Sequence, residues 1–395
     1  MNYILFDDEA RTSLLPLTDT RPVSEIRIGI MTIAEKWKKF IEGDFSYLTD
    51  AYLSQKFRYE PGNENIFING SVLPTQSLKK EIQTLKQGEK LTKGNTLIAG
   101  RMDSNVSKAK SIGDIKFLKS IECKSEYIKL NYPWDIFAFN AEAFTIDYNI
   151  LTKGRRTIGI STTNTIIAPG NIFLEEGAKV ECALLNGSTG FIYIGKDAEI
   201  MEGAMIRGPF SLGEHSQVKM GAKIYGATTV GPQCKVGGEI NNSVIFGFTN
   251  KAHDGFLGNS VLGEWCNLGA DSNNSNLKNN YSKIKVWNFS EEDFINSGLQ
   301  FCGLIMGDHS KCSINTMFNT GTVVGVSANI FGTGFPPKFV PSFAWGGSEG
   351  FSTYRIEDAL EVAARVYERR NIEFSKIEQD IIRDLFETST KFRSW

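Results

Sequence analysis

The clearest pattern along the chain is an aliphatic residue that returns at every sixth position. The longest run keeps one phase through Ile194, Ile200, Ile206, Leu212, Val218, Ile224, Val230 and Val236. A second run keeps one phase through Met306, Cys312, Phe318, Val324 and Ile330, and the pair Leu262 and Leu268 lies between the two runs. An α-helix repeats near 3.6 residues and a half-buried strand repeats every second residue, so neither explains the period. A coil built from six-residue units, each one short strand and one turn, does explain it.

Small residues beside the aliphatic positions predict a stack of triangular coils between residues 165 and 331. Glycine follows the aliphatic residue at several turns and permits their dihedral angles, as at Gly195, Gly213, Gly231, Gly263, Gly269 and Gly325. The regular pattern breaks at residues 241–255 and 279–303, where loops that carry function can leave the stack. In the second break, Ser290 followed by three acidic residues predicts a short helix.

The segments on either side of the repeats have other patterns. Before them, apolar strands at residues 3–6 and 65–70 alternate with helical patterns at residues 33–41 and 78–85, which is typical of an α/β domain. After them, two amphipathic helices are predicted from about residue 353, and we expect them to close the open end of the coil. The predicted organisation is an α/β domain at residues 1–155, a β-helix at residues 156–340 and a helical cap at residues 341–395.

Composition excludes some functional classes. The formal net charge of −2 gives no reason to expect a nucleic-acid partner. The six cysteines are scattered without a Cys-x-x-Cys pair, so neither a metal site nor a disulfide framework is expected. No apolar stretch is long enough to span a bilayer, and the N-terminus does not read as a signal peptide. We therefore expect a cytoplasmic protein without a membrane partner.

The three histidines differ in their place in the repeat. His215 and His309 each lie three residues after the aliphatic position of a regular unit, where side chains commonly face outward. Both are therefore predicted to be surface turn residues. His253 lies in the first break. Spacing alone leaves a functional role and an ordinary polar loop role equally open for His253.

Three segments around His253 carry a resemblance to a known family. They are Lys-Ala-His-Asp-Gly-Phe-Leu-Gly at residues 251–258, Leu-Gly-Glu-Trp-Cys-Asn-Leu-Gly-Ala at residues 262–270, and Ser-Asn-Leu-Lys-Asn at residues 275–279. They resemble the K-A-x-H-x-x-Y-L-G, N-I-G-A-G and N-Y-D-G segments of the acetyltransferase half of bifunctional GlmU enzymes. Those enzymes acetylate glucosamine 1-phosphate and then couple the product to UTP. The resemblance implies a left-handed parallel β-helix that uses acetyl-CoA.

The resemblance implies a role for each matching residue. His253 matches the general base, and Asn267 matches a residue that binds the amino sugar. Ala270 and Asn276 match positions that contact acetyl-CoA. A neutral histidine can take the proton of a sugar ammonium near physiological pH, and the free amine can then attack the thioester. This step needs no metal.

Four positions depart from the family pattern. One residue is missing between Ala252 and His253. Phe256 stands where the family has a substrate-binding tyrosine, and Asn241 stands near a lysine that binds the sugar phosphate. Leu277 replaces a tyrosine in the acetyl-CoA segment. Phe256, Asn241 and Lys251 are nevertheless predicted to lie at the sugar, and Leu277 at the cofactor.

The N-terminal domain has a more distant resemblance. Residues 9–22 directly follow a strand, where sugar nucleotidyltransferases carry a G-x-G-T-R-x-x-P-x-T loop and a lysine. Such loops cradle phosphates through backbone N–H groups, but this chain lacks the glycines. The resemblance implies that Arg11 and Thr12 belong to a nucleotide-binding loop and that Arg21 replaces the lysine.

A second nucleotidyltransferase motif is altered as well. Asn69 and Gly70 resemble the start of the family's N-G-D-V-L segment and are the other nucleotide-binding candidates. Ser71 stands where a metal-binding aspartate is expected. The resemblance therefore implies a Mg²⁺ site in the N-terminal domain only. We expect Mg²⁺ binding there to be weak, because one hard oxygen ligand is lost.

Three functions therefore remain open. The first is a bifunctional enzyme that makes a UDP-N-acetylglucosamine-type nucleotide sugar from a sugar phosphate and a nucleotide. The second is an acyltransferase with a degenerate nucleotidyltransferase domain. The third is a non-catalytic nucleotide-sugar-binding protein. Because a triangular coil has flat faces and the resembling acyltransferases build sites between subunits, we also expect a homotrimer.

Overall fold

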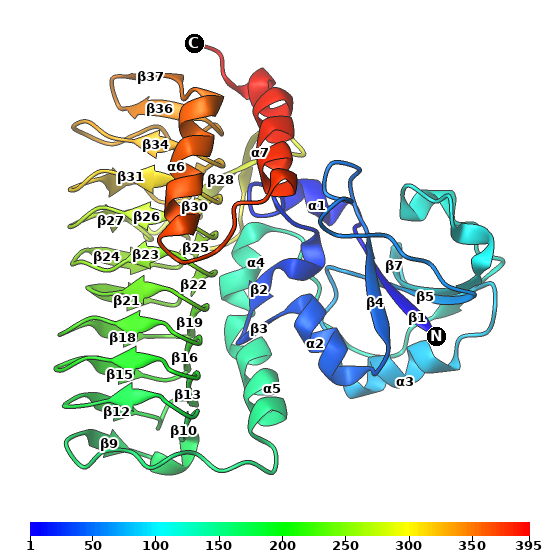
Figure 1. The fold of residues 1–395 in the computed structure, drawn as a ribbon, viewed down its shortest axis with the longest axis horizontal. Helices are drawn as coiled ribbons and strands as arrows, with labels where there is room; N and C mark the ends of the chain where they lie inside the picture. The colour runs from blue at the N-terminus through cyan, green and yellow to red at the C-terminus, as the bar shows by residue number, and fades with distance from the viewer.

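An α/β domain lies along the side of a long β-helix in the structure, a computed structural model that describes residues 1–395 except for the side chain of Asn105 (Figure 1). The C-terminal helices lie between the upper coils and the N-terminal domain (Figure 1). Both the α/β domain and the β-helix confirm the predicted fold class. Among the described residues, no helix combines the length and the apolar character that a bilayer crossing requires.

The N-terminal domain is built on a mixed sheet. Its strand order is β4 (Asp44–Leu48), β1 (Asn2–Phe6), β5 (Glu64–Asn69), β7 (Thr96–Asp103), β6 (Glu89–Lys93) and β8 (Lys119–Glu122). Strand β1 pairs in parallel with β4 and β5, and β7 runs antiparallel to β5. The carboxyl ends of β1 and β5 therefore meet at one edge, where both resemblance motifs of this domain begin.

Two helices of this domain, α2 and α3, lie close to the positions predicted for them. Helix α2 (Ile33–Phe40) starts with a capping box in which Thr32 and Glu35 satisfy each other's backbone N–H groups. The other helices are α1 (Ala10–Ser13), α3 (Gln76–Thr84), α4 (Pro133–Ala138) and α5 (Asn140–Thr152), and the short strands β2 (Arg27–Ile28) and β3 (Met31–Thr32) form a hairpin. Helix α5 leads directly into the first coil.

Three sheets form the faces of the β-helix. The first contains β10 (Ile172–Leu174), β13 (Ile192–Ile194), β16 (Phe210–Leu212), β19 (Thr228–Val230), β22 (Val244–Ile245), β25 (Val261–Leu262), β30 (Leu304–Met306), β33 (Thr322–Val324) and β35 (Phe339–Val340). The second contains β11 (Lys179–Val180), β14 (Glu199–Ile200), β17 (Gln217–Val218), β20 (Lys235–Val236), β23 (Asn250–Lys251), β26 (Asn267–Leu268), β31 (Lys311–Cys312), β34 (Asn329–Ile330), β36 (Ala344–Gly347) and β37 (Gly350–Thr353).

The sheet of the third face has fewer strands because the chain leaves the coil at residues 279–303. It contains β24 (Phe256–Gly258), β21 (Glu239–Asn241), β18 (Lys223–Tyr225), β15 (Met205–Arg207), β12 (Leu184–Asn186) and β9 (Thr165–Ile167), and the pair β27 (Asn273–Asn274) and β32 (Met317–Phe318) follows separately. The strands of successive coils pair in parallel, as Ile194 with Leu212 and Val218 with Val236. The period-six aliphatic residues from Ile194 to Val236 are all buried inside the coil. The parallel sheets are consistent with the left-handed β-helix expected from such repeats.

The two predicted breaks differ in the structure. At residues 241–255 the coil continues through β22 and β23. At residues 279–303 the chain leaves as a hairpin of β28 (Lys285–Asn288) and β29 (Asp293–Asn296), so the helix predicted after Ser290 is wrong. The Asn288 side chain accepts hydrogen bonds from the N–H groups of Ser290 and Glu291, and Trp287 stacks on Phe339 with ring centroids 4.1 Å apart. Tertiary packing of the strand thus outweighs the local helix signal.

The C-terminal helices lie along the side of the coil and not across its last strands (Figure 1). They are α6 (Ile356–Glu368) and α7 (Lys376–Thr388). Their apolar faces pack with Leu53 of the N-terminal domain and with Val326 and Phe343 of the coil. The strands of the coil continue past residue 340, to Thr353. The helices therefore join the two larger parts instead of closing an end.

Helix α5 makes a second junction between these parts. Asn140 donates to the Ala227 carbonyl at 2.6 Å, and the Thr229 hydroxyl donates to the Gly29 carbonyl at 2.8 Å. Tyr148 stacks on Phe191, with ring centroids 4.2 Å apart. These buried contacts hold the α/β domain against the coil at a fixed position.

Candidate functional site

His253 lies in the turn between β23 and β24, and its side chain is exposed. The turn is held from inside the coil, because the His253 carbonyl accepts a hydrogen bond from the Lys251 ammonium at 2.5 Å. Gly238, at a positive φ of 74°, lies below the same turn, and an added Cβ there would meet the His253 oxygen at 2.8 Å. The imidazole is therefore presented to solvent on a fixed backbone.

Lys251 occupies an inward-facing position of the coil. Strand pairing puts it next to Val236, an aliphatic position of the repeat. Its ammonium also donates to the carbonyls of Gly237, at 3.2 Å, and Asp254, at 3.1 Å. Burial lowers the pKa of Lys251 to about 8, although Asp254 opposes this shift. The structure therefore does not bring Lys251 to the surface as a substrate ligand; it fixes the His253 turn.

The next coil stacks directly on this turn. Asn250 pairs with Asn267, and the Asp271 N–H donates to the Asp254 carbonyl at 3.1 Å. This register places Ala270 above His253. Asn267 is exposed on β26. The structure thus brings the general-base candidate, the sugar-binding candidate and one acetyl-CoA candidate to neighbouring coils.

The remaining coil candidates lie on the adjoining face. Phe256 follows His253 closely, and its N–H donates to the Asn273 side chain at 2.7 Å. Asn241 pairs with Gly258 across neighbouring strands. Asn276 donates to the Asn259 side chain at 2.8 Å. Each is half-buried, so each keeps part of its side chain available to a ligand.

Leu277 lines an open groove at the point where the chain leaves the coil. The groove has a volume of about 410 Å³ and is lined by Ser275, Leu277, Lys278, Asn279, Asn280, Asn319 and Thr320. Its lining is mainly polar, with one cationic side chain.

Arg11 of the N-terminal loop is committed to internal contacts. Its guanidinium is buried, and it donates to Asp50 at 2.7 Å, to the Tyr52 hydroxyl at 2.8 Å and to the Arg21 carbonyl at 3.0 Å. A further ion pair joins it to Asp7 at 3.4 Å. The segment around it forms helix α1 instead of an open glycine-rich loop. The prediction that Arg11 binds a nucleotide phosphate therefore does not fit the structure.

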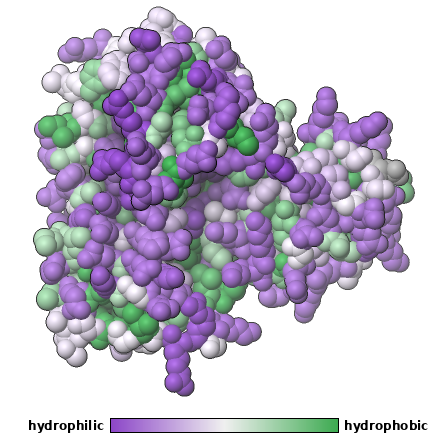
Figure 2. Space-filling view, in the orientation of Figure 1, coloured by the Kyte–Doolittle hydropathy of each residue, from purple (hydrophilic) through white to green (hydrophobic). Residues whose placement is uncertain are grey.

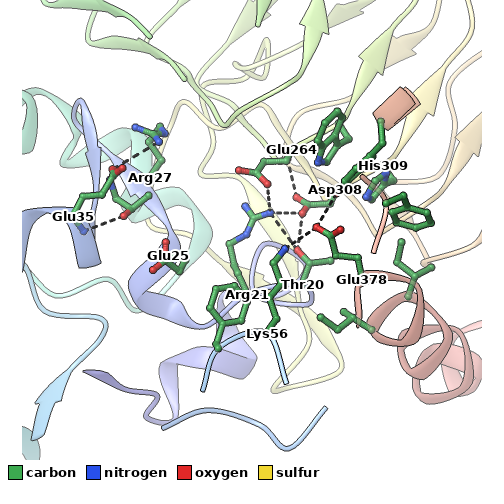
Figure 3. A pocket seen from close by; sticks show the side chains of 17 residues that line it. Thr20, Arg21, Glu25, Arg27, Glu35, Lys56, Glu264, Asp308, His309 and Glu378 are labelled. Atoms are coloured by element: carbon green, nitrogen blue, oxygen red, sulfur yellow. Dashed lines mark hydrogen bonds and ion pairs between the residues drawn. The ribbon is translucent and has the colours of Figure 1, made fainter. Parts of the chain in front are cut away.

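Arg21 is committed as well, but to the coil. It is buried, forms an ion pair with Asp308 and another with Glu264 at 3.1 Å, and the neighbouring Thr20 hydroxyl donates to Asp308 at 2.6 Å (Figure 3). Both acidic residues belong to turns of the β-helix. The coil thus supplies the negative charge that a phosphate was expected to supply, and the loop serves to dock the two domains.

Asn69 and Gly70, the second motif of the N-terminal domain, are covered by other residues of the same domain. Asn69 donates to Asp8 at 2.8 Å and accepts from the Ser71 hydroxyl at 2.6 Å. A Cβ added at Gly70 would meet Ser24 at 3.2 Å, so the segment after Arg21 covers this glycine. Thr12 is the one nucleotide candidate whose side chain is exposed.

The same edge offers poor ligands to Mg²⁺. The Lys129 ammonium lies 3.1 Å from Asp8, and Asp7 is engaged by Arg11, Thr49 and the Val23 N–H. Within the part of the chain that the structure describes, no group of three His, Cys, Asp or Glu side chains is placed to hold a metal ion. Since Mg²⁺ prefers several free oxygen ligands, the residues present do not fit it.

The two histidines of the regular units have different environments. His215 is exposed, as predicted. The prediction that His309 is a surface residue is wrong: its ring is buried next to Trp265 and Tyr367, with centroids 6.3 and 6.1 Å away. Tyr367 comes from α6. The burial could not be read from the repeat, because the covering helix lies in another part of the sequence.

Comparison with known proteins finds a similar family and similar relatives. Residues 3–156 match a family model described as sugar nucleotidyl transferase. The chain is 23% identical over 221 residues to the bifunctional protein GlmU of Methanococcus maripaludis, covering 56% of this chain and 47% of the relative. It is 26% identical over 216 residues to a bifunctional sugar-1-phosphate nucleotidylyltransferase/acetyltransferase of Sulfurisphaera tokodaii, covering 54% and 47%. The chain spans about half the length of these curated relatives.

Solved structures resemble the chain at lower sequence identity than these relatives. A UDP-N-acetylglucosamine acyltransferase from Campylobacter jejuni covers 59% of this chain and 83% of its own length, with 16% identity and a TM-score of 0.25. The parallel pairing of strands in successive coils shows the β-helix without this overlap. Residues 3–156 are similar to sugar nucleotidyl transferases, and the chain resembles, over about half its length, bifunctional nucleotidyltransferase/acetyltransferases of the GlmU type.

Proposed function

We propose that this protein is a sugar-phosphate N-acetyltransferase that uses acetyl-CoA and carries the reaction at the His253 turn. The observation that supports this most is the exposed His253 imidazole on a turn held by Lys251, with Ala270 stacked above it and Asn267 exposed on the next coil. The similarity to bifunctional acetyltransferases supplies the substrate class.

The proposed reaction follows from the chemistry of these groups. His253 takes a proton from the sugar ammonium, and the free amine attacks the thioester carbonyl of acetyl-CoA. A new amide bond forms, the carbon–sulfur bond breaks, and the thiol of coenzyme A leaves. Backbone N–H groups at the edge of the coil can stabilise the oxyanion that forms in between. Asn267 holds the sugar, and Asn276, Leu277 and the groove beside them hold the acyl donor.

Nucleotidyl transfer by the N-terminal domain is the second candidate function. It is favoured by the family match over residues 3–156. Against it stand the internal contacts of Arg11 and Arg21 and the closed site around Gly70. We therefore place acetyl transfer first and a coupled synthesis of a UDP-N-acetylglucosamine-type sugar second. A cytoplasmic homotrimer with sites between subunits completes the proposal, and a monomer in sedimentation at micromolar concentration would count against shared sites.

Mass spectrometry of the products separates these candidates. The purified chain is incubated with acetyl-CoA, glucosamine 1-phosphate, UTP and Mg²⁺. The proposal predicts an acetylated sugar phosphate. Additional nucleotide sugar and pyrophosphate would establish the bifunctional enzyme, and binding without any product would contradict acetyl transfer.

A further inference from the structure

A cavity of about 290 Å³ lies where the N-terminal domain, the coil and the C-terminal helices meet, and nothing described so far uses it. Its walls come from residues 20–35 and 56–57, from coil residues 264–265 and 308–309, and from residues 367–382 of the last two helices (Figure 3). The surface is hollowed between the coil and the N-terminal domain, among mostly hydrophilic residues (Figure 2). Junctions between domains are where small-molecule sites commonly form, and this volume suits a small ligand.

One wall of the cavity is aromatic. Trp265 stacks on Tyr367 with ring centroids 4.0 Å apart and on Phe248 at 4.2 Å. Phe248, Trp265 and His309 come from three successive coils and share the same corner of the coil, each at a positive φ of 61° or 62°. Bulky residues rarely adopt this backbone conformation. The corner therefore gathers rings where glycine or asparagine would fit the turn more easily.

Two buried polar groups at the cavity lack a partner among the described residues. They are Nη1 of Arg21 and Nδ1 of His309. Both residues line the cavity, and their exposed fractions are 5% for Arg21 and 6% for His309. Buried polar atoms in folded proteins are nearly always hydrogen-bonded, so these two leave unused hydrogen-bonding capacity in side chains that line the cavity.

The charges around the cavity disfavour an anionic ligand. Its cations are already paired: Arg21 with Asp308 and Glu264, Arg27 with Glu35 at 3.8 Å, and Lys56 with Glu378 at 3.1 Å (Figure 3). Glu25 has no cation in these pairs and accepts instead from the Tyr47 hydroxyl at 2.5 Å. Carboxylates therefore outnumber cations, and a phosphate group would meet net repulsion.

We propose that this cavity binds an unphosphorylated monosaccharide, with preference for one that carries a free amino group. A sugar ring can pack its apolar C–H groups against the edges of the aromatic wall, because the faces of Trp265 are already covered by Phe248 and Tyr367. Its hydroxyl groups can accept from Arg21 and pair with His309. An ammonium group would be attracted by the excess of carboxylates. None of the lining residues belongs to the proposed acetyltransferase site, so the inference stands independently of that function.

Isothermal titration calorimetry of the full chain, in the absence of acetyl-CoA, tests the proposal. Glucosamine, glucose, glucosamine 6-phosphate and UMP are the probes. We expect saturable binding of glucosamine, weaker binding of glucose, and at least about tenfold weaker binding of the two phosphorylated probes. His309→Gln should weaken glucosamine binding about tenfold, and Glu264→Gln should weaken glucosamine more than glucose.

Two matched variants make the result decisive. His215→Gln changes the equivalent, exposed histidine of another coil and should leave binding unchanged. Every titration is repeated with Asn267→Ala, which weakens the proposed acetyltransferase site, so that the binding that remains belongs to the cavity. The proposal is overturned if, in Asn267→Ala, neither sugar binds or a phosphorylated probe binds more tightly than glucosamine, or if Asn267→Ala abolishes binding while His309→Gln does not. Circular dichroism establishes that each variant is folded.

Discussion

His309 occupies the position in its six-residue unit that His215 occupies in an earlier coil, yet only His309 is buried. Both follow an acidic residue, and both have a positive φ, 62° and 56°. The difference comes from Tyr367 of α6, which covers His309 and stacks on Trp265. One corner of a regular solenoid thus becomes an internal junction because a distant helix packs on it.

The burial of His309 predicts a pH-dependent stability. Burial lowers the pKa of His309 well below its usual value, and Lys311, Lys56 and Arg21 lower it further. Below about pH 6.5 the unfolded chain takes up a proton that the folded chain does not, so the folded state loses about 1.4 kcal/mol per pH unit from this group. Above that pH the group contributes no such dependence.

Urea denaturation of the wild type and of His309→Phe between pH 7.5 and 5 measures this contribution. The difference between their unfolding free energies should shift in favour of the variant as the pH falls below about 6.5. His215→Phe is the control and should show no such shift. A constant difference between the wild type and His309→Phe would show that the folded protein accommodates the protonated ring.

Arg21 pairs with two carboxylates, those of Asp308 and Glu264, and we expect their removal to lower the stability by unequal amounts. Asp308 is buried, whereas the Glu264 side chain is about one third exposed, at 35%. Asp308→Ala leaves a buried guanidinium without its main partner and should lower the unfolding free energy by about 3–5 kcal/mol. Glu264→Ala should cost about 1 kcal/mol or less. Equal losses in chemical denaturation would contradict the view that Asp308 docks the loop.

The buried ammonium of Lys251 predicts the same direction of pH dependence as His309, but in a higher pH range. Its folded pKa of about 8 lies below the ordinary value of 10.5. Between these values the unfolded chain binds more protons, so stability rises with pH. The unfolding free energy of the wild type should therefore rise relative to Lys251→Met by up to about 3 kcal/mol from pH 8 to pH 10.5. No relative rise would mean that the ammonium stays charged through its three carbonyl contacts.

Much of the fold follows from the sequence because its signals are local. The period of six predicts the coil, and Thr32 with Glu35 marks the start of α2. The roles of Arg21 and His309 could not be predicted, because their partners lie far away in the chain or come from another domain. The inward position of Lys251 could not be predicted either, because this residue lies in the break of the pattern and out of phase with the repeats; only its strand pairing with Val236 places it inside the coil.

The rate of acetyl transfer by His253→Ala tests the central claim most directly. General-base assistance is typically worth about a hundredfold to ten-thousandfold in rate. With acetyl-CoA and glucosamine 1-phosphate, His253→Ala should lose that much activity while its affinity for acetyl-CoA stays nearly unchanged, because the base acts on the amine. His215→Ala, an exposed histidine in a repeat turn, should retain wild-type activity. Wild-type acetylation by His253→Ala would contradict the assignment of the base and remove the main support for an acetyltransferase.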